Sequence, residues 1–232
     1  MPSYLFDVDG TLTSSRQRID KDFAVWFSRF CENNKVYLVT GSDKPKTIEQ
    51  VGEYIYFRCK KVYQCSGNDV WAGDTQLKTQ EVKWHAHTLG FFSNELNESV
   101  YPIKTGIHVD YRAGLINFSI VGRRATADQR ANYTMYDKQV NERLKIADRF
   151  NKQFPQYQAS VAGETGIDIV PRGSHKGQII TDFDFSHDIH FFGDKCDKGG
   201  NDYELAMAVD ERGGSTHKVN GWEDTWKILK EL

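Results

Sequence analysis

Apolar and polar positions along the first third of the chain separate short buried strands from amphipathic helices. Residues 3–8 form an apolar run that ends in the turn Asp9-Gly10-Thr11, which predicts a buried strand. Asp20 is a suitable N-cap for a helix through residue 30 that carries three phenylalanines on one stripe. The pattern also predicts strands over 35–40 and 61–64, with a helix over 45–56 between them. Such alternation is typical of a parallel sheet with flanking helices.

The pattern changes from about residue 75 and indicates a different layer. Two short alternating runs are joined by Ala113-Gly114, which is a hairpin signal, and helical stretches lie on either side of them. The predicted elements are a helix over 79–97, strands over 106–112 and 115–122, a helix over 126–153, and strands over 156–161 and 166–170. Helices packed on one antiparallel sheet are expected here.

The first pattern resumes after Pro171, with a helix over 176–181, a buried strand over 188–193 and helices over 203–209 and 224–232. We therefore predict an α/β protein with a Rossmann-like core whose sheet is parallel, built from residues 1–74 and 174–232. Residues 75–173 are predicted to form an inserted α+β cap, with helices on an antiparallel sheet.

Composition bounds the partners of the protein. The 232 residues carry a net charge of −2, so no bulk attraction to nucleic acid or to an anionic membrane is expected. Apolar runs are strand-sized, which predicts no membrane span. The acidic pair Asp7 and Asp9 follows Met1 almost at once and leaves no room for a signal peptide, and the four cysteines lack CxxC spacing. We expect a cytoplasmic protein with reduced thiols.

Asp7 and Asp9 stand at the end of the first predicted strand and are the leading candidates for chemistry. One carboxylate can attack phosphorus while it holds a hard cation, and the other can protonate the leaving oxygen. A calcium loop is excluded because its sixth and twelfth positions would be Leu12 and Arg18 instead of Gly and Glu. A capped turn without chemistry remains open on this motif alone.

Polar residues at three further strand or helix ends favour the chemical interpretation. Thr40 and Ser42 follow the second strand, Lys176 opens a later helix, and Asp194 follows the strand over 188–193, with Asp202 shortly after it. The carboxyl ends of parallel strands form the binding crevice of open α/β sheets, so these side chains are expected to converge.

In this order and spacing, the four elements resemble the haloacid dehalogenase (HAD) superfamily, whose members form an aspartyl phosphate. The resemblance implies a HAD-like core, with Asp7 as nucleophile and Asp9 as acid/base. It places Thr40 and Ser42 at the hydroxyl motif, Lys176 at the lysine motif, and Asp194 with Asp202 at the acidic motif. The implied metal is Mg²⁺, with ligands from Asp7, Asp9, Asp194 and Asp202.

Nearly the whole chain is similar to the eukaryotic-type phosphomannomutases. The similarity rests on residues 6–13 with Arg16-Gln17-Arg18-Ile19, on residues 191–195 and 199–202, and on the cap motifs Asp110-Tyr111-Arg112-Ala113-Gly114 and Val121-Gly122-Arg123. Guanidinium groups give bidentate, permanently charged anchors for the phosphate of a sugar that lies away from the nucleophile. The implied substrate-binding residues are Arg16, Arg112, Arg123, Arg130, Asp168 and Asn68.

The resemblance implies that mannose 1-phosphate and mannose 6-phosphate are interconverted, with a hexose 1,6-bisphosphate as activator and a homodimer through the cap. Local differences from the family pattern keep a sugar-phosphate phosphatase of the same fold open, among them Ser66-Gly67-Asn68-Asp69, which loosely replaces a Glu-Asn-Gly motif. Thr40-Gly41-Ser42-Asp43 replaces Gly-Gly-Ser-Asp, Gly166-Ile167-Asp168 replaces Ser-Phe-Asp, and the motif Ser174-His175-Lys176-Gly177 is more phosphatase-like. A non-catalytic sugar-phosphate binding protein is a more remote alternative.

Overall fold

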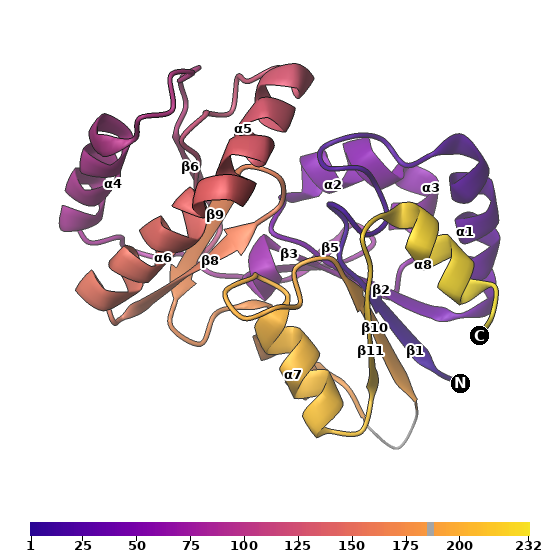
Figure 1. Ribbon diagram of the computed structural model, residues 1–232. Helices are drawn as coiled ribbons and strands as arrows, with labels where there is room; N and C mark the ends of the chain where they lie inside the picture. The colour runs from indigo at the N-terminus through magenta and orange to yellow at the C-terminus, as the bar shows by residue number, and fades with distance from the viewer. Residues whose placement is uncertain (185–187) are drawn as a thin grey trace.

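The larger of two sheets has seven strands and is mainly parallel (Figure 1). The computed structural model describes residues 1–184 and 188–232. The first five strands of the sheet run parallel, and the last two are antiparallel additions at one edge. The strand order is β11 (Ser215–Lys218), β10 (Ile189–Gly193), β1 (Ser3–Phe6), β2 (Lys35–Val39), β3 (Lys61–Gln64), β4 (Asp69–Ala72) and β5 (Thr75–Thr79).

Helices cover both faces of this sheet, because successive strand residues point to opposite sides. Phe6 packs with the helices on one face and Leu5 with those on the other. The first face is covered by α1 (Lys21–Asn33), α2 (Lys44–Val51), α3 (Glu53–Tyr56) and α8 (Trp222–Leu229), and the second by the 3₁₀ helix η2 (Lys176–Asp182) and α7 (Tyr203–Glu211). The Asp20 side chain caps α1 by accepting from two backbone N–H groups, as predicted.

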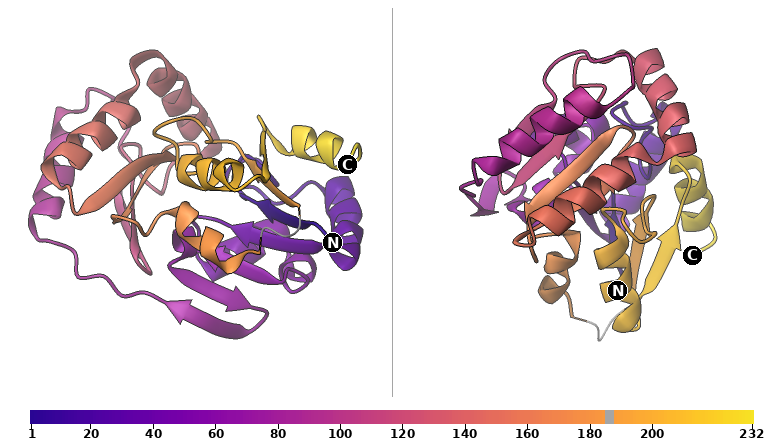
Figure 2. Two further views of the ribbon diagram at one scale, coloured as in Figure 1. Left: turned by 90° about the horizontal axis from the view of Figure 1, so that it is seen from below. Right: turned by 60° about the vertical axis from the view of Figure 1, so that its left-hand side comes forward.

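The smaller sheet is antiparallel and forms a second unit beside the first (Figure 2). Ile116, Phe118, Ile167 and Ile169 pack under the helices of this unit, so the intervening residues of the same strands face the larger sheet. The strand order is β6 (Val109–Arg112), β7 (Leu115–Phe118), β9 (Gly166–Pro171) and β8 (Tyr157–Ala162), and the helices are α4 (His87–Glu98), α5 (Ala127–Val140) and α6 (Glu142–Gln153).

Two predicted helices are each divided in the structure. The helix over 126–153 is broken at Asn141, which adopts a left-handed conformation with φ 53° between α5 and α6. The helix over 45–56 is broken at Gly52, with φ 82°, between α2 and α3. Gly and Asn are the residues that most readily adopt positive φ, so each can end a helix at these positions. The amphipathic pattern continues across both breaks, and for this reason the sequence predicted one helix in each case.

The predicted fold class is confirmed, but three short strands, β4, β5 and β11, were not predicted. β11 follows α7, and β5 pairs with β4 and extends the larger sheet beyond residue 74. The division into residues 1–74 with 174–232 and residues 75–173 therefore stays a prediction, and β5 argues for moving its first boundary past residue 79. Over residues 1–184 and 188–232, none of the helices has the length and apolar character that a membrane span requires.

Candidate active site

Three carboxylates meet at the carboxyl ends of the central strands. Asp7 follows β1, Asp194 follows β10, and Asp202 immediately precedes α7. One oxygen of each lies within 4.8 Å of the others. Gly10 allows this approach, because its φ is 87° and a Cβ at that position would lie 2.6 Å from Oδ2 of Asp194. The fold therefore brings together the side chains of Asp7, Asp194 and Asp202, which are three of the four predicted metal ligands.

Lys176 compensates part of the negative charge. Its buried ammonium donates to Asp7 Oδ1 at 2.6 Å and to Asp202 Oδ1 at 2.7 Å. The two carboxylates raise the pKa of Lys176 against the opposing effect of burial, so this side chain stays charged. Burial raises the pKa of Asp7, while Lys176 opposes the rise. Burial likewise raises the pKa of Asp194, which is paired with Lys195.

The cluster has the composition that a hard divalent cation requires. Carboxylate oxygens from three separate segments converge, and Lys176 and Lys195 together offset two of their three charges. Mg²⁺ is bound through one or two carboxylates together with phosphate oxygens and water. Asp7, Asp194 and Asp202 therefore fit a magnesium site that is completed by a phosphorylated substrate.

Asp9 is held separately from this cluster by a set of hydrogen bonds. Its Oδ1 accepts from the backbone N–H of Arg16 at 2.6 Å and from Nε2 of Gln50 at 3.0 Å. Its Oδ2 lies 3.5 Å from the hydroxyl of Ser42. The carboxylate thus has one oxygen tied to protein donors and one directed towards the hydroxyl turn, an arrangement suited to proton transfer.

The turn after β2 forms one wall of the site. The Thr40 hydroxyl accepts a hydrogen bond from the backbone N–H of Ser42 at 3.0 Å. Between them, the Gly41 carbonyl accepts from Nη1 of Arg112 at 2.5 Å. A Cβ on Gly41 would lie 2.4 Å from Oδ2 of Asp168, so the two sheets approach closely at this glycine. The predicted hydroxyl motif of the larger unit therefore contacts two predicted substrate residues of the smaller one.

Basic residues gather on the opposite wall. Asp110 pairs with both Arg112 and Arg123 at 2.8 and 2.9 Å, and Asn117 donates to Asp168 at 2.7 Å. Burial lowers the pKa of Arg123 to about 10, and repulsion from Arg112 and Arg16 adds to the fall. The neighbouring guanidinium groups repel one another, Asp110 and Asp168 oppose this effect at Arg123, and a bound anion would relieve the repulsion further.

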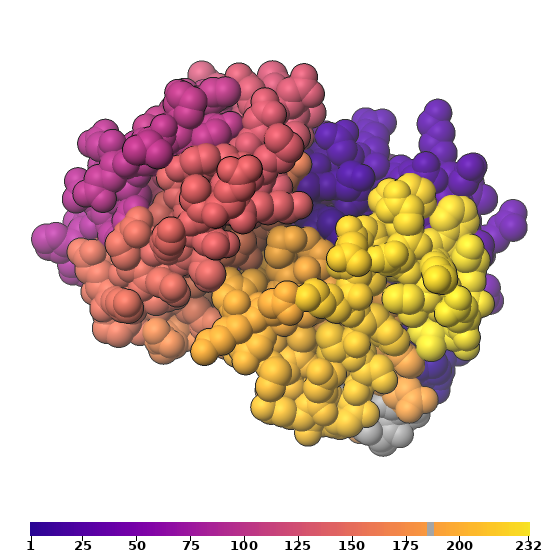
Figure 3. All heavy atoms as spheres, in the orientation of Figure 1, coloured from indigo at the N-terminus to yellow at the C-terminus, as the bar shows by residue number. Residues whose placement is uncertain are grey.

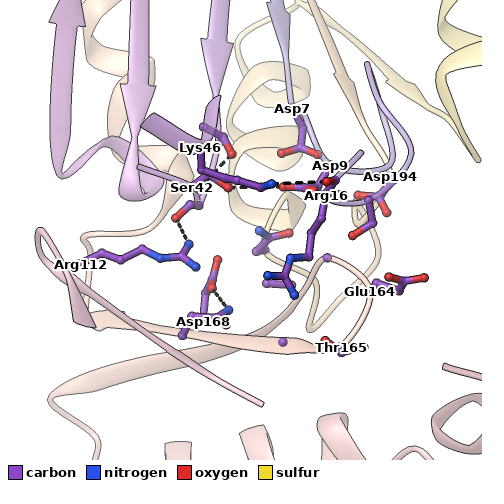
Figure 4. A pocket seen from close by; sticks show the side chains of 18 of the residues that line it. Asp7, Asp9, Arg16, Ser42, Lys46, Arg112, Glu164, Thr165, Asp168 and Asp194 are labelled. Atoms are coloured by element: carbon purple, nitrogen blue, oxygen red, sulfur yellow. Dashed lines mark hydrogen bonds between the residues drawn. The ribbon is translucent and has the colours of Figure 1, made fainter. Parts of the chain in front are cut away.

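The cleft between these walls contains the predicted residues Asp7, Asp9, Arg16, Thr40, Ser42, Arg112, Arg123, Asp168 and Asp194 (Figure 4). Its free volume is about 60 Å³. Ligand pockets generally measure about 300–1,000 Å³, so this cleft is nearly closed. The space-filling view shows the two units lying side by side on this face of the molecule (Figure 3).

Four predicted site residues lie behind the cleft wall. Lys176 and Asp202 lie beneath Asp7, as their mutual hydrogen bonds show. Arg130 pairs with the wall residue Glu164 at 3.0 Å. Asn68 donates to the backbone carbonyls of Cys65, Gly114 and Ser174, which brings its amide to the crossing between the two units. Direct substrate contacts by Arg130 and Asn68 stay predictions.

Several cleft residues were not predicted from the sequence. They are Ser15, Lys46, Asn117, Ala162, Gly163, Glu164, Thr165 and Asn201. Asn117 could have been found from its alternation with the buried Ile116 and Phe118, since it must face away from the helices. Thr165 supplies a hydroxyl next to Gly166, the position where the family pattern Ser-Phe-Asp has a serine and this chain has none. The loop residues had no comparable periodic signal.

A mainly parallel sheet with an acidic cluster at its carboxyl edge, beside a second unit with an antiparallel sheet, is the architecture of the haloacid dehalogenase-like hydrolases. A haloacid dehalogenase-like hydrolase from Bacteroides thetaiotaomicron has the same fold, with a TM-score of 0.57 and 10% identity over 98% of each chain. The sequence matches the eukaryotic phosphomannomutase family over residues 24–232.

Two curated relatives support this match over nearly the full length. The chain is 33% identical to a phosphomannomutase of Saccharomyces cerevisiae, over 98% of this chain and 92% of that protein. It is 32% identical to a phosphomannomutase of Triticum aestivum, over 98% and 94%. The chain belongs to the eukaryotic phosphomannomutase family, and it is an enzyme of the phosphotransferase type, as the sequence resemblance predicted.

Proposed function

We propose that this enzyme interconverts mannose 1-phosphate and mannose 6-phosphate through an aspartyl phosphate and a hexose 1,6-bisphosphate. The observation that carries the proposal is the cleft itself. An acidic cluster with a buried lysine forms one wall, and arginines that repel one another form the other. A substrate with two phosphates on one sugar can satisfy both walls at once.

Asp7 is proposed as the nucleophile. Its carboxylate oxygen forms a bond to phosphorus while the bond from phosphorus to the sugar oxygen breaks. Lys176 at 2.6 Å keeps this carboxylate paired and offsets charge on the equatorial phosphoryl oxygens. Ser42 and Thr40 are proposed to contribute hydroxyl and backbone N–H donors to the same oxygens from the neighbouring turn.

Asp9 is proposed to protonate the departing sugar oxygen and, in the reverse direction, to accept the proton of the attacking hydroxyl. Oδ2 is the oxygen assigned to this exchange, because Oδ1 accepts two hydrogen bonds from the protein. Mg²⁺ held by Asp7, Asp194, Asp202 and the Asp9 carbonyl would neutralise charge on the transferring phosphoryl group.

The distal phosphate is assigned to the cap arginines. Arg112 and Arg123 lie on the cleft wall, and Arg16 reaches it from the core loop after Asp9. Burial lowers the pKa of Arg16, and the charge of Arg130 adds to the fall, so Arg130 contributes to the same positive field from behind Glu164. Asp168, supported by Asn117, is assigned to a sugar hydroxyl.

Exclusion of water is the step that separates transfer from hydrolysis. The nearly closed cleft has too little space for a hexose phosphate, so the cap is proposed to open for binding and to close for chemistry. The bisphosphate would turn round beneath the cap before the second transfer. We extend the proposal to a hexose 1,6-bisphosphate activator, a homodimer through the cap and a cytoplasmic location.

A coupled assay tests the proposal directly. Mannose 1-phosphate and Mg²⁺ are incubated with and without glucose 1,6-bisphosphate, and mannose 6-phosphate and free phosphate are followed together. Activator-dependent mannose 6-phosphate with little free phosphate is expected. Free phosphate as the main product, indifferent to activator, would show a phosphatase instead. Asp7→Asn provides the control, since it retains the shape of the side chain and removes the nucleophile.

A further inference from the structure

Gln50 contacts the proposed acid/base although it was not among the residues that the sequence pointed to. It lies in the last turn of α2 and is 1% exposed. Its Nε2 donates to Asp9 Oδ1 at 3.0 Å and to Thr13 Oγ1 at 3.2 Å. The amide therefore joins a helix of the core to the loop that contains the proposed catalytic carboxylate.

The orientation of this amide is determined by its neighbours. A carboxylate oxygen can only accept, and the Thr13 hydroxyl donates its proton to the Val8 carbonyl at 3.3 Å. Both neighbours therefore require the N–H side of Gln50. Its Oε1 is left buried, and it has no hydrogen-bond partner among residues 1–184 and 188–232.

An unpaired buried carbonyl is unfavourable, at about 1–3 kcal/mol. A hydrophobic side chain of similar volume would avoid that cost and still fill the space. The hydrogen bonds that the Gln50 amide donates to Asp9 and Thr13 therefore explain a polar residue at this position better than packing does. Unsatisfied buried groups of this kind concentrate at functional sites.

The rest of the network fixes the same loop. Arg16 has a left-handed backbone, with φ 60°, which turns its N–H onto Asp9 Oδ1. The Gln50 carbonyl accepts from the Ile19 N–H at 2.8 Å, and Lys46, one turn earlier on α2, donates to the Arg16 carbonyl at 3.4 Å. One helix thus secures both the carboxylate and the loop of the proposed substrate arginine.

We propose that Gln50 is a positioning residue for proton transfer by Asp9. By donating to Oδ1 together with the Arg16 N–H, it fixes the plane of the carboxylate so that Oδ2 faces the cleft beside Ser42. The inference rests on the proposed function, in which Asp9 gives its proton to the leaving sugar oxygen as the oxygen–phosphorus bond breaks. Without Gln50 the carboxylate can rotate, and Oδ2 is no longer held at the leaving oxygen.

The test compares two leaving groups. Hexose 1-phosphate needs a proton on its departing oxygen, whereas a nitrophenyl phosphate releases nitrophenolate without one. The burst of nitrophenolate in the first turnover reports phosphorylation of Asp7 alone. For Gln50→Leu we expect kcat on hexose 1-phosphate to fall about 10–100-fold, which is part of the 10²–10⁴-fold contribution of a general acid, with KM and the burst rate nearly unchanged.

Gln64→Leu is the matched control. Gln64 is also a buried glutamine of the core, but it contacts Thr47 and Tyr56 away from the cleft. The Gln64→Leu substitution is expected to lower the melting temperature. It should not change the activity on hexose 1-phosphate relative to the activity on nitrophenyl phosphate. Gln50→Met, which keeps the length of the side chain and removes its donors, serves as a second variant should Gln50→Leu fail to fold.

Asp9→Asn separates failure of the inference from failure of the proposed function. If Asp9→Asn loses hexose turnover and retains the burst while Gln50→Leu or Gln50→Met behaves like the wild type, Gln50 has no positioning role. Equal loss on both substrates in the Gln50 variants would also overturn the inference, because it indicates general damage. If Asp9→Asn itself shows no dependence on the leaving group, the role of Asp9 is wrong and both proposals fall.

Discussion

Arg112 of the smaller unit, the proposed cap, donates a hydrogen bond to the carbonyl of Gly41 in the larger unit, and Asp168 of the smaller unit lies against the same glycine. The contact joins a proposed phosphate anchor to the turn that contains the proposed transition-state donors. Arg112 is also paired with Asp110, so its guanidinium is already oriented towards the cleft. In the proposed mechanism, closure of the cap and arrangement of the phosphate site are therefore the same structural event.

Gly41→Ala should weaken this closure. The new Cβ would lie 2.4 Å from Oδ2 of Asp168, which forces the cap to stay slightly open. A displacement of this kind is expected to lower phosphoryl transfer between sugar positions by about 10–100-fold and to raise the fraction lost to water. The ratio of mannose 6-phosphate to free phosphate measures the effect.

Gly90→Ala is the control for this substitution. Gly90 is exposed within α4, and a Cβ there meets nothing within 4 Å. It is expected to raise stability by about 1 kcal/mol through helix propensity and to leave the product ratio unchanged. An unchanged ratio in Gly41→Ala would show that the close approach at Gly41 does not govern exclusion of water.

Arg112→Ala and Arg123→Ala should each reduce binding of the distal phosphate. A hydrogen bond to a charged group contributes about 1.5–3 kcal/mol, so kcat/KM for mannose 1-phosphate is expected to fall about 10–100-fold in each variant. Arg124→Ala replaces an exposed neighbour and should have little effect. Acetyl phosphate has no distal phosphate, so its turnover should be nearly unaffected by all three substitutions. If Arg112→Ala and Arg123→Ala also lose turnover of acetyl phosphate, these arginines act on the phosphate at the nucleophile instead.

The motif positions were predictable because each follows a strand whose burial is evident from its sequence. Asp7, Ser42 and Asp194 follow β1, β2 and β10, and parallel strands bring their carboxyl ends to one edge. The helix break at Asn141 and the strand β5 were not predictable in the same way. β5 is exposed throughout and has no alternating apolar side, so pairing with β4 alone determines its conformation.

Gln50 and Arg130 show why the site was predicted less completely than the fold. Gln50 occupies one position of an amphipathic helix, where a buried glutamine cannot be told from a packed residue without its partner Asp9. The substrate contact of Arg130, inferred from its place on the helix, stays a prediction, and the hydrogen bond from its Nε to Glu164 was not predicted. Side-chain partners come from distant segments, and a single sequence contains no record of those contacts.

Addition of Mg²⁺ should stabilise the protein through the carboxylate cluster. Asp7, Asp194 and Asp202 repel one another, and Lys176 and Lys195 neutralise only part of their charge. A ligand present at 100 times its dissociation constant adds about 2.7 kcal/mol to the free energy of unfolding. We expect a higher melting temperature with Mg²⁺ than with a chelator. Asp194→Asn should abolish this difference, whereas Asp197→Asn, at an exposed carboxylate paired with Lys218, should retain it.

Stability should also fall as the pH is lowered through the range of histidine titration. His190 and His217 lie on neighbouring strands with Nδ1 and Nε2 3.0 Å apart, and their rings stack with Tyr4 and Phe192. Burial lowers the pKa of both from 6.5, and for His217 the neighbouring His190 adds to the fall.

At these two histidines the unfolded chain therefore binds more protons than the folded protein below pH 6.5, so their contribution to the free energy of unfolding decreases with falling pH. Urea denaturation at pH 7.5 and 5.5 measures the difference. His217→Gln removes one titrating ring and the repulsion between two protonated histidines, so it should reduce the pH dependence. His87→Gln, at an exposed position of α4, should leave it as in the wild type. If the free energy of unfolding falls equally in His217→Gln and in the wild type between pH 7.5 and 5.5, the pH dependence arises elsewhere in the protein.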